Sequence, residues 1–439
     1  MAYPQTSGRL PFESASKTGH LPLMSDPLIR RLVQGFQIPQ YSYSGRDAIP
    51  LCWNRFSPGQ TGIRKVICCD GSYQETRLDS CDLVYIRVGV QRLGLDLTPG
   101  LLHPFQMQEE IRCNSECIQT VLPAEIPCYS QQDFSRKMRE AIFATVASHP
   151  GLLTTFRWIF TEGWTGPKPL PAIQCPRCGG YLFPDSADSC TCTCGEPVYI
   201  TDVLGWDKDL GGKASHVEVA ARFMLVLEFL FLMTCIRQMW TEAPEQLPGT
   251  LFLHDGPLSI GGRYTQLIVP LRHFFRYAQE TGNPVLLCGV EKTGYYVNHF
   301  LSLGHSQSQT GHYFTVPSHA YIQQEIEGRP ITAAHRYGDR HLLGERVFVR
   351  LPEGRQYVLT VTSSLEDNLP DRPVPEDLIG LNEILNVLPK LVTPVYDNAL
   401  FPIARVNNLV SMASEPAGHM LELFSDTLLW ERRDETADD

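Results

Sequence analysis

The sequence predicts an α/β protein, with a mixed β-sheet core flanked by helices and an inserted cysteine-rich ribbon. Short runs of apolar and β-branched residues alternate along the chain with longer patterns of helical period. A cysteine cluster within residues 172–199 interrupts this alternation. Strands that alternate with helices are typical of an α/β sandwich built around a mixed sheet.

The composition is that of a globular protein. The chain has 439 residues, of which 43% are hydrophobic and 19% charged, and this argues against long disordered stretches. The net charge of -11 argues against a protein that coats nucleic acid by bulk charge, but it does not exclude a local basic channel. The first residues lack the pattern of a secretory signal, so we expect a cytoplasmic protein without a disulfide framework.

Five segments follow from the pattern along the chain. They are an N-terminal extension (1–60), the first part of the core (61–171), the cysteine ribbon (172–200), the second part of the core (201–430) and an acidic tail (431–439). The most apolar stretch, residues 223–233, is shorter than the roughly 20 residues of a membrane span and contains Glu228. We therefore expect a buried helix and no membrane partner.

The individual elements are predicted by period and by capping residues. Strands are expected at 64–72, 81–93, 249–258, 283–294 and 345–363, and helices at 25–36, 104–121, 131–147, 215–241 and from 377 onward.

Two of the predicted strands end in the same way. Asp70 follows the apolar residues 66–69 and precedes Gly71, and Asp255 follows residues 251–254 and also precedes a glycine. Each Asp-Gly pair is either a turn or an acid held at a strand end to bind a metal.

The presence of Glu228 favours the metal-binding interpretation over the turn. A carboxylate inside an apolar helix is costly to bury unless it is hydrogen-bonded, neutral or bound to a cation. The strand that leads to Asp255 is ~15 Å long, which corresponds to about 10 residues of the preceding helix. This places Glu228 level with Asp255, whereas Glu218 would overshoot. Three converging carboxylates suit Mg²⁺ or Mn²⁺, which align a water and a phosphate for displacement.

The cysteine cluster has the spacing of a zinc site. Cys175 and Cys178 form a C-x₂-C pair, and Cys190, Cys192 and Cys194 follow. Paired cysteines on tight turns present four thiolates to a structural Zn²⁺. We expect Cys175, Cys178, Cys192 and Cys194 to be the ligands, with Cys190 as the alternative to Cys192.

Four motifs together resemble those of the NurA nucleases. They are CCDGSY (68–73), LFLHDGPL (251–258), GVEKTG (289–294) and LFPIARVNNLV (400–410). The resemblance spans residues 60–425, and it depends on the order and spacing of motifs that are individually short.

The resemblance implies an RNase H-like core and manganese-dependent exonuclease activity on DNA. It also implies a homodimer that works with a hexameric ATPase translocase of the HerA type. Asp70, Glu228 and Asp255 would then be the metal ligands. The last motif of the family usually offers a His or an Asp, and Asn407 occupies that place here, beside Asn408. An amide oxygen can bind a hard cation but adds no charge.

Lys292, in the third motif, either contacts a phosphate or orients the attacking water, or it is an exposed turn lysine. Glu291 would point the opposite way on an extended chain, so Lys292 is the preferred site residue. The run 335–355 contains five arginines, which either line a groove for phosphates or lie on a solvated strand face.

Two functions are consistent with these features. The first is a manganese- or magnesium-dependent DNA nuclease that processes ends together with the ATPase, in break processing or in anti-phage defence. The alternative is a non-catalytic NurA-like adaptor that binds the ATPase and DNA. A zinc-ribbon nucleic-acid binder without an enzyme site is weaker, because it leaves Glu228 unexplained.

Overall fold

The computed structural model divides into two units, residues 1–48 and 49–439. The structure describes residues 26–35, 49–78, 80–95, 114–166, 168–183, 188–303, 311–328, 337–338, 341–365, 372–392, 400–412 and 417–437. The described part of the first unit is helix α2 (Pro27–Gly35), where a helix is predicted. All further elements belong to the second unit.

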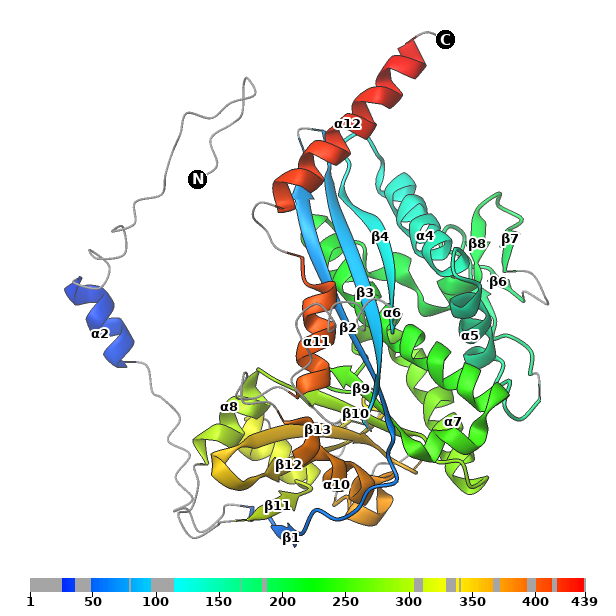
Figure 1. The fold of residues 1–439 in the computed structure, drawn as a ribbon. Helices are drawn as coiled ribbons and strands as arrows, with labels where there is room; N and C mark the ends of the chain where they lie inside the picture. The colour runs from blue at the N-terminus through cyan, green and yellow to red at the C-terminus, as the bar shows by residue number, and fades with distance from the viewer. Residues whose placement is uncertain are drawn as a thin grey trace. The chain divides into compact units, whose positions relative to one another are not determined.

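A nine-stranded mixed sheet forms the centre of the second unit (Figure 1). Its strands, in spatial order, are β1 (Asn54–Phe56), β11 (His312–Thr315), β12 (Gly344–Arg350), β13 (Gln356–Thr362), β10 (Leu286–Glu291), β9 (Thr250–Asp255), β2 (Lys65–Arg77), β3 (Asp82–Gly94) and β4 (Ser115–Glu125). Strand β9 runs parallel to both β2 and β10, and all other neighbouring pairs are antiparallel.

The strand order confirms the predicted fold class. The five strands β4-β3-β2-β9-β10 form an antiparallel meander followed by two parallel strands, which is the order of an RNase H-like core. The other four strands extend the sheet beyond β10.

Helices cover both faces of the sheet (Figure 1). One face packs against α4 (Gln131–Ala147), α5 (Pro150–Phe160), α6 (Lys213–Glu242) and α7 (Ile268–Glu280). The other face packs against α10 (Leu381–Leu391) and α11 (Phe401–Val410). Helix α8 (Tyr295–Ser302) lies against β12 and β13, and α12 (Ala417–Ala437) ends the described chain. Because side chains alternate along a strand, Ile67 and Cys69 join the α6 core while Val66 and Cys68 join the α11 core.

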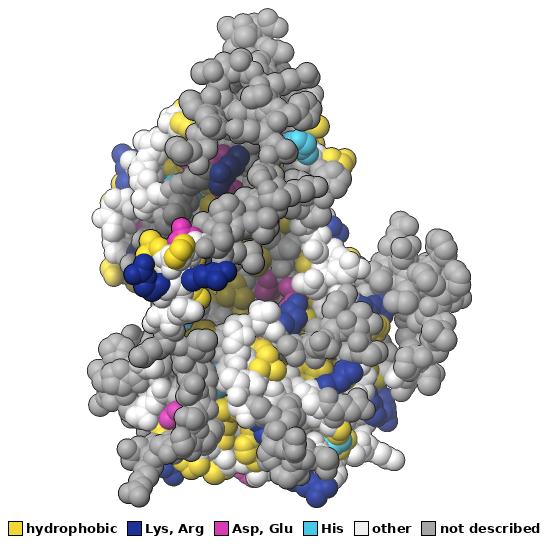
Figure 2. Space-filling view, turned by 90° about the vertical axis from the view of Figure 1, so that its left-hand side faces the viewer, with side chains coloured by type: hydrophobic (Ala, Val, Ile, Leu, Met, Phe, Trp, Pro, Cys, Tyr) yellow, Lys and Arg dark blue, Asp and Glu magenta, His cyan; other side chains and the backbone are white. Residues whose placement is uncertain are grey.

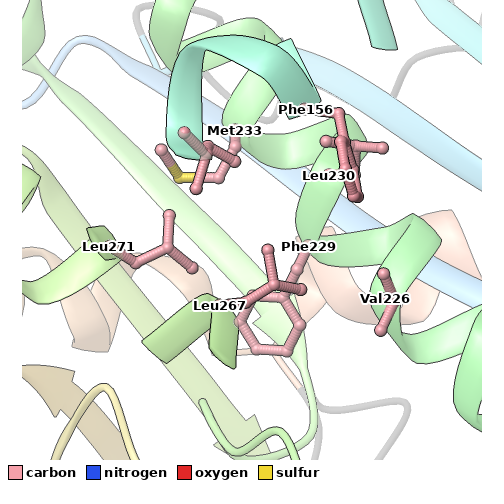
Figure 3. Close-up of a pocket in the computed structure, with 8 residues that line it drawn as sticks. Phe156, Val226, Phe229, Leu230, Met233, Leu267 and Leu271 are labelled. Carbon is pink, nitrogen blue, oxygen red and sulfur yellow. The ribbon is translucent and has the colours of Figure 1, made fainter. Parts of the chain in front are cut away.

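Helix α6 is the predicted apolar helix. Its length and composition would suit a membrane span, yet 78% of its most apolar window is buried inside the protein. The space between α5, α6 and α7 is filled almost completely, since the cavity among Phe156, Leu230, Met233 and Leu271 has a volume of only about 10 Å³ (Figure 3). This volume holds at most about one water, and its wall is apolar. Such packing fixes the rotation of α6 and therefore the position of Glu228.

One predicted helix is wrong in its described part. Residues 104–113 lie outside the described residues, but 115–121 belong to strand β4 and pair with β3. Ile118 and Leu122 are both buried and four residues apart, a spacing that fits one face of a helix and one face of a strand equally well. Pairing with β3 decided between the two.

Two of the predicted segment boundaries can be compared with elements of the structure. Strand β1 falls within the predicted N-terminal extension, yet it pairs with β11 of the sheet. Helix α12 continues to Ala437, inside the predicted acidic tail. The division into five segments stays a prediction.

Candidate active site

Three adjacent strands bring Asp70, Asp255 and Lys292 together at the level where β9 and β10 end. The prediction that the first of these strands ends at Asp70-Gly71 is wrong, because β2 continues to Arg77 in its pairing with β3. Cys69 of β2 lies opposite His254 of β9, so Asp70 and Asp255 follow at neighbouring positions. Val290 of β10 lies opposite Asp255, and Lys292 follows two residues later. Alternation then points all three side chains to the face of the sheet on which α11 packs.

A chain of contacts links four of the predicted site residues. Asn407 of α11 donates from Nδ2 to Asp70 Oδ2 over 2.9 Å. The carboxyl group of Asp255 lies close enough to Asp70 for its charge to raise the pKa of Asp70. Lys292 Nζ lies 2.5 Å from Asp255 Oδ2. The Gly71 amide also donates to Asp70 Oδ1 over 2.8 Å, so the orientation of Asp70 is fixed from two sides.

Glu228 reaches the site from α6, on the opposite face of the sheet. A Cβ added at Gly71 would overlap Glu228 Oε1, so the glycine provides the space in which this carboxylate lies beside β2. The other carboxylate oxygen, Oε2, lies 2.9 Å from Nε2 of the buried His254. The structure thus places Glu228 next to the residue that follows Asp70.

Burial and mutual repulsion perturb the acids. Burial raises the pKa of Asp70 to about 8, and the nearby charges of Asp255 and Glu228 add to this effect, while Lys292 opposes it. Burial also raises the pKa of Glu228, although its hydrogen bond to His254 acts in the other direction. For His254, burial lowers the pKa, but the hydrogen bond and the charge of Glu228 outweigh this effect and the net shift is upward.

These carboxylates fit a divalent cation by their chemistry. Hard oxygen donors that repel one another in a buried place are stabilised when a cation offsets their charge. The carboxylate oxygens do not converge on a single position, because Asp255 is paired with Lys292 and Glu228 is paired with His254. Within the described part of the chain, only the four ribbon cysteines meet the stricter condition that at least three ligating atoms lie within 4.8 Å of one another.

The space-filling view shows how acids and cations are distributed. Acidic side chains lie in a hollow near the middle of the face drawn, and Lys or Arg side chains lie beside them and around the hollow (Figure 2). A phosphate that approaches such a hollow meets cationic groups before it meets the carboxylates.

Glu291 points away from this site. It forms a buried ion pair with Arg346, whose Nε lies 2.8 Å from Glu291 Oε1, and the guanidinium stacks on Tyr296 at 3.6 Å from the ring centroid. Arg350 is also buried and lies over the ring of Trp53. These two arginines of the basic run are therefore internal and line no groove for phosphates. Arg336 and Arg340 lie outside the described residues.

Sequence reasoning missed three residues that shape the site. His254 binds Glu228, and its position one residue before Asp255 was the available signal, because neighbours on a strand face opposite sides. Ser72 donates to the carbonyl of Val410 over 2.5 Å and so fixes the end of α11. Gly89 of β3 lies directly beneath Val410, where a Cβ would come within 2.6 Å of the valine side chain. No pattern in the sequence indicates these last two contacts.

The cysteine ribbon is made of two short hairpins. Cys175 and Cys178 lie between β5 (Ile173–Gln174) and β6 (Tyr181–Leu182), and Cys192 and Cys194 lie between β7 (Ser189–Thr191) and β8 (Pro197–Tyr199). The four sulfur atoms lie within 4.8 Å of one another, so they form a cluster that can hold a metal ion. Cys190, the alternative ligand, lies on β7 outside this cluster.

The turns and electrostatics of the ribbon suit a metal. Gly179 and Gly195 adopt φ values of 72° and 85° directly after the second cysteine of each pair, a conformation that favours glycine. The backbone amide of Cys194 donates to Cys192 and lowers the pKa of this thiol to about 6, which favours the thiolate that metals bind. Burial instead raises the pKa of Cys175 to about 12, so a cation would be needed to hold it as a thiolate.

A buried ion network attaches the ribbon to the core. Arg139 of α4 contacts Glu196 over 2.5 Å and Asp202 over 2.7 Å, and all three side chains are almost fully buried. The ribbon is therefore held against α4 in one orientation.

The fold and the site together define an α/β protein that carries an acidic cluster on adjacent parallel strands, at the level where β9 and β10 end. No family model and no curated protein matches the sequence. Among solved structures, the chain is similar to the NurA nuclease from Sulfolobus solfataricus, with 10% identity over 86% of this chain and 88% of that one and a TM-score of 0.35.

Two further similar structures are NurA with manganese and NurA bound to dAMP and manganese. Their identities are 10% and 11%, they cover 86% and 85% of this chain and 91% and 90% of their own, and both TM-scores are 0.27. The similar structures are thus NurA nucleases, the family that the sequence motifs resemble. At this level of similarity, function has to be argued from the site itself.

Proposed function

We propose that this chain is a divalent-metal-dependent DNA nuclease of the NurA type. The observation that carries the proposal is the pair of Asp70 and Asp255, whose carboxyl groups lie close together beside Lys292 and Asn407. Burying two like charges in contact is costly, so a protein retains such a pair where a ligand compensates for it.

Asp70, Asp255 and Glu228 would hold the metal ion, manganese or magnesium, and Asn407 would support Asp70. A bound divalent ion supplies charge stabilisation for the phosphate and lowers the pKa of a water. The ammonium group of Lys292 lies next to Asp255 and can donate a hydrogen bond to a non-bridging phosphate oxygen. Asn407 donates a hydrogen bond to Asp70 and so keeps the carboxylate turned toward Asp255.

We further propose that the four ribbon cysteines hold a structural Zn²⁺, which agrees with four thiols on two tight turns. The homodimer, the HerA-type ATPase and a role in break processing or anti-phage defence are proposed on the motif resemblance alone. The cytoplasmic location stays a proposal from the sequence.

A second candidate is the non-catalytic adaptor. The presence of the neutral Asn407 where the family usually has His or Asp favours it, as does the pairing of Lys292 with Asp255. In this case the acidic cluster would hold the fold together and would bind no metal.

Cleavage of end-labelled linear DNA tests whether the protein is a nuclease or a non-catalytic adaptor. Purified wild-type protein is expected to degrade the DNA in manganese, and Asp70→Ala is expected to lose at least roughly 100-fold in rate. Glu140→Gln, at an exposed acid on α4, is the matched control and should retain activity. Metal dependence is best tested by leaving manganese out, because a chelator would also remove the ribbon metal.

Manganese binding, measured by calorimetry, separates the two candidates. A nuclease requires wild-type binding that is lost in Asp70→Ala and Asp255→Ala. If the wild type neither binds manganese nor cleaves DNA, with or without a HerA-type ATPase, the nuclease proposal is wrong and the adaptor is favoured.

A further inference from the structure

The outer face of the first ribbon hairpin carries two exposed aromatic rings. Tyr181 and Phe183 are 69% and 73% exposed, the two highest values among the exposed aromatic side chains that the structure describes. Tyr181 lies in β6, which ends at Leu182, and Phe183 follows directly, so the two exposed rings flank the less exposed Leu182. The intervening Leu182 is half-buried and turns toward the core. The hairpin therefore separates an apolar inner side from an aromatic outer side.

A cation is held next to these rings. Gln174 is the direct cross-strand partner of Tyr181, so the two side chains lie side by side on the outer face. Lys208, which is exposed, donates to Gln174 Oε1 over 2.9 Å, and this contact places its ammonium group near Tyr181. Arg177 lies exposed in the turn of the same hairpin, where it donates to the carbonyl of Cys194.

The charge of the segment contrasts with that of the whole chain. Residues 163–184 contain no Asp or Glu, although the protein carries a net charge of -11. The nearest acids along the described chain on each side, Glu162 and Asp188, are engaged in ion pairs with Lys168 and Arg157. Asp207 and Asp209 flank Lys208 in the chain, and Asp209 is paired with Arg222. The outer face thus presents two aromatic rings with the cations Lys208 and Arg177 beside them, a combination that suits a polyanion that carries bases.

We propose that the outer face of this hairpin, formed by Gln174, Tyr181 and Phe183 with Lys208, binds a single strand of nucleic acid. Bases stack on the two rings, and the ammonium group contacts a phosphate. Stacking requires unpaired bases, because in a duplex the faces of the bases are already occupied by their neighbours. The hairpin is held by the cysteine cluster, so the rings are ordered before the strand arrives. The site does not depend on the acidic cluster, and it would guide a single-stranded end in a nuclease or serve as the nucleic-acid contact of an adaptor.

The test uses the full chain with the Asp70→Ala substitution, in the absence of manganese, so that cleavage plays no part. Binding of a fluorescein-labelled oligothymidylate of about 20 nucleotides, long enough to span one binding site, and of a duplex of equal length is followed by anisotropy. Tyr181→Ala with Phe183→Ala should weaken single-strand binding by roughly 5- to 150-fold for each base that loses its stacking partner. Duplex binding should change much less. Tyr181→Phe keeps the ring and should retain affinity, and Tyr129→Ala removes an exposed tyrosine elsewhere as the control.

Two further measurements make the result specific. Lys208→Gln should reduce the slope of log affinity against log salt by about 0.7, the value expected for one single-strand phosphate contact. Metal content and thermal unfolding show whether each variant has kept the ribbon. Two results overturn the proposal. One is unchanged single-strand affinity in the double variant. The other is a double variant that no longer self-associates but keeps its single-strand affinity, because the outer face would then bind a second copy of the chain. Failure of the wild type to cleave DNA would affect the nuclease proposal and leave this site unaffected.

Discussion

Replacement of Asp70 by asparagine should stabilise the protein while it removes the proposed activity. The folded state raises the pKa of Asp70 from 3.8 to about 8. Protonated Asp70 therefore contributes stability that is fully present below pH 3.8 and is lost as the pH rises through about 8. The amide introduced by Asp70→Asn is neutral at every pH, so the variant avoids this loss.

The size of the effect follows from these two values. At pH 7 the folded protein still holds on Asp70 a proton that the unfolded chain has released, and this costs about 4 kcal/mol, from the difference of about 3 pH units between pH 7 and the unfolded pKa of 3.8 at about 1.36 kcal/mol each. Asp70 accepts hydrogen bonds from Gly71 and Asn407, and an amide has only one acceptor oxygen. The loss of one acceptor costs about 1 kcal/mol, so the net gain of Asp70→Asn at pH 7 is roughly 3 kcal/mol.

Urea denaturation followed by circular dichroism measures this gain. The experiment uses protein that retains its ribbon metal, in buffer without manganese, at pH 6, 7 and 8. The stability difference between Asp70→Asn and wild type should grow by about 2 kcal/mol from pH 6 to pH 8, since over most of this range the folded wild type keeps on Asp70 a proton that the unfolded chain has released. Glu140→Gln, at an exposed position, should differ from wild type by less than about 0.5 kcal/mol throughout.

Two results would refute this reasoning. A difference that does not change with pH would mean that Asp70 does not titrate in this range. A variant that is less stable than wild type at all three pH values would mean that the carboxylate is stabilised by its partners, as in an ordinary ion pair. Either result would remove the electrostatic argument for a cation at this site.

The remaining predictions concern the ribbon and two glycines. Cys192→Ser should lose the ribbon metal, whereas Cys190→Ser should retain one equivalent, as measured by atomic absorption; equal metal content in both would contradict the assigned ligands. Gly71→Ala should displace Glu228 and lower the DNA cleavage rate at least roughly 10-fold with little change in fold, and unchanged cleavage would show that Glu228 is not needed there. Gly89→Ala should destabilise the protein by about 1–3 kcal/mol in urea, because α11 must move away from β3, and a neutral substitution would show that α11 adjusts freely.

Local patterns were sufficient for the general class of the fold. Apolar runs that end in Asp-Gly, an apolar helix with one acid and paired cysteines each reflect constraints that act within a few residues of the chain. These patterns placed β9, α6, the ribbon and the start of β2 correctly, whereas β2 continues through Asp70-Gly71 to Arg77 because it pairs with β3 over that length. They failed at β4, where the spacing of Ile118 and Leu122 fits a helix and a strand alike and only pairing with β3 decides.

The sequence by itself therefore determined the α/β class, the cysteine cluster and the residues that could form an acidic site. The tertiary structure alone decided which of these residues meet. The parallel register of β2 and β9 places Asp70 beside Asp255, and the packing of α11 on Gly89 brings Asn407 to Asp70 from a position 337 residues away in the chain. His254 likewise meets Glu228 only because α6 packs against one face of the sheet. Contacts of this kind depend on the relative position of whole elements, and no periodicity along the chain encodes that position.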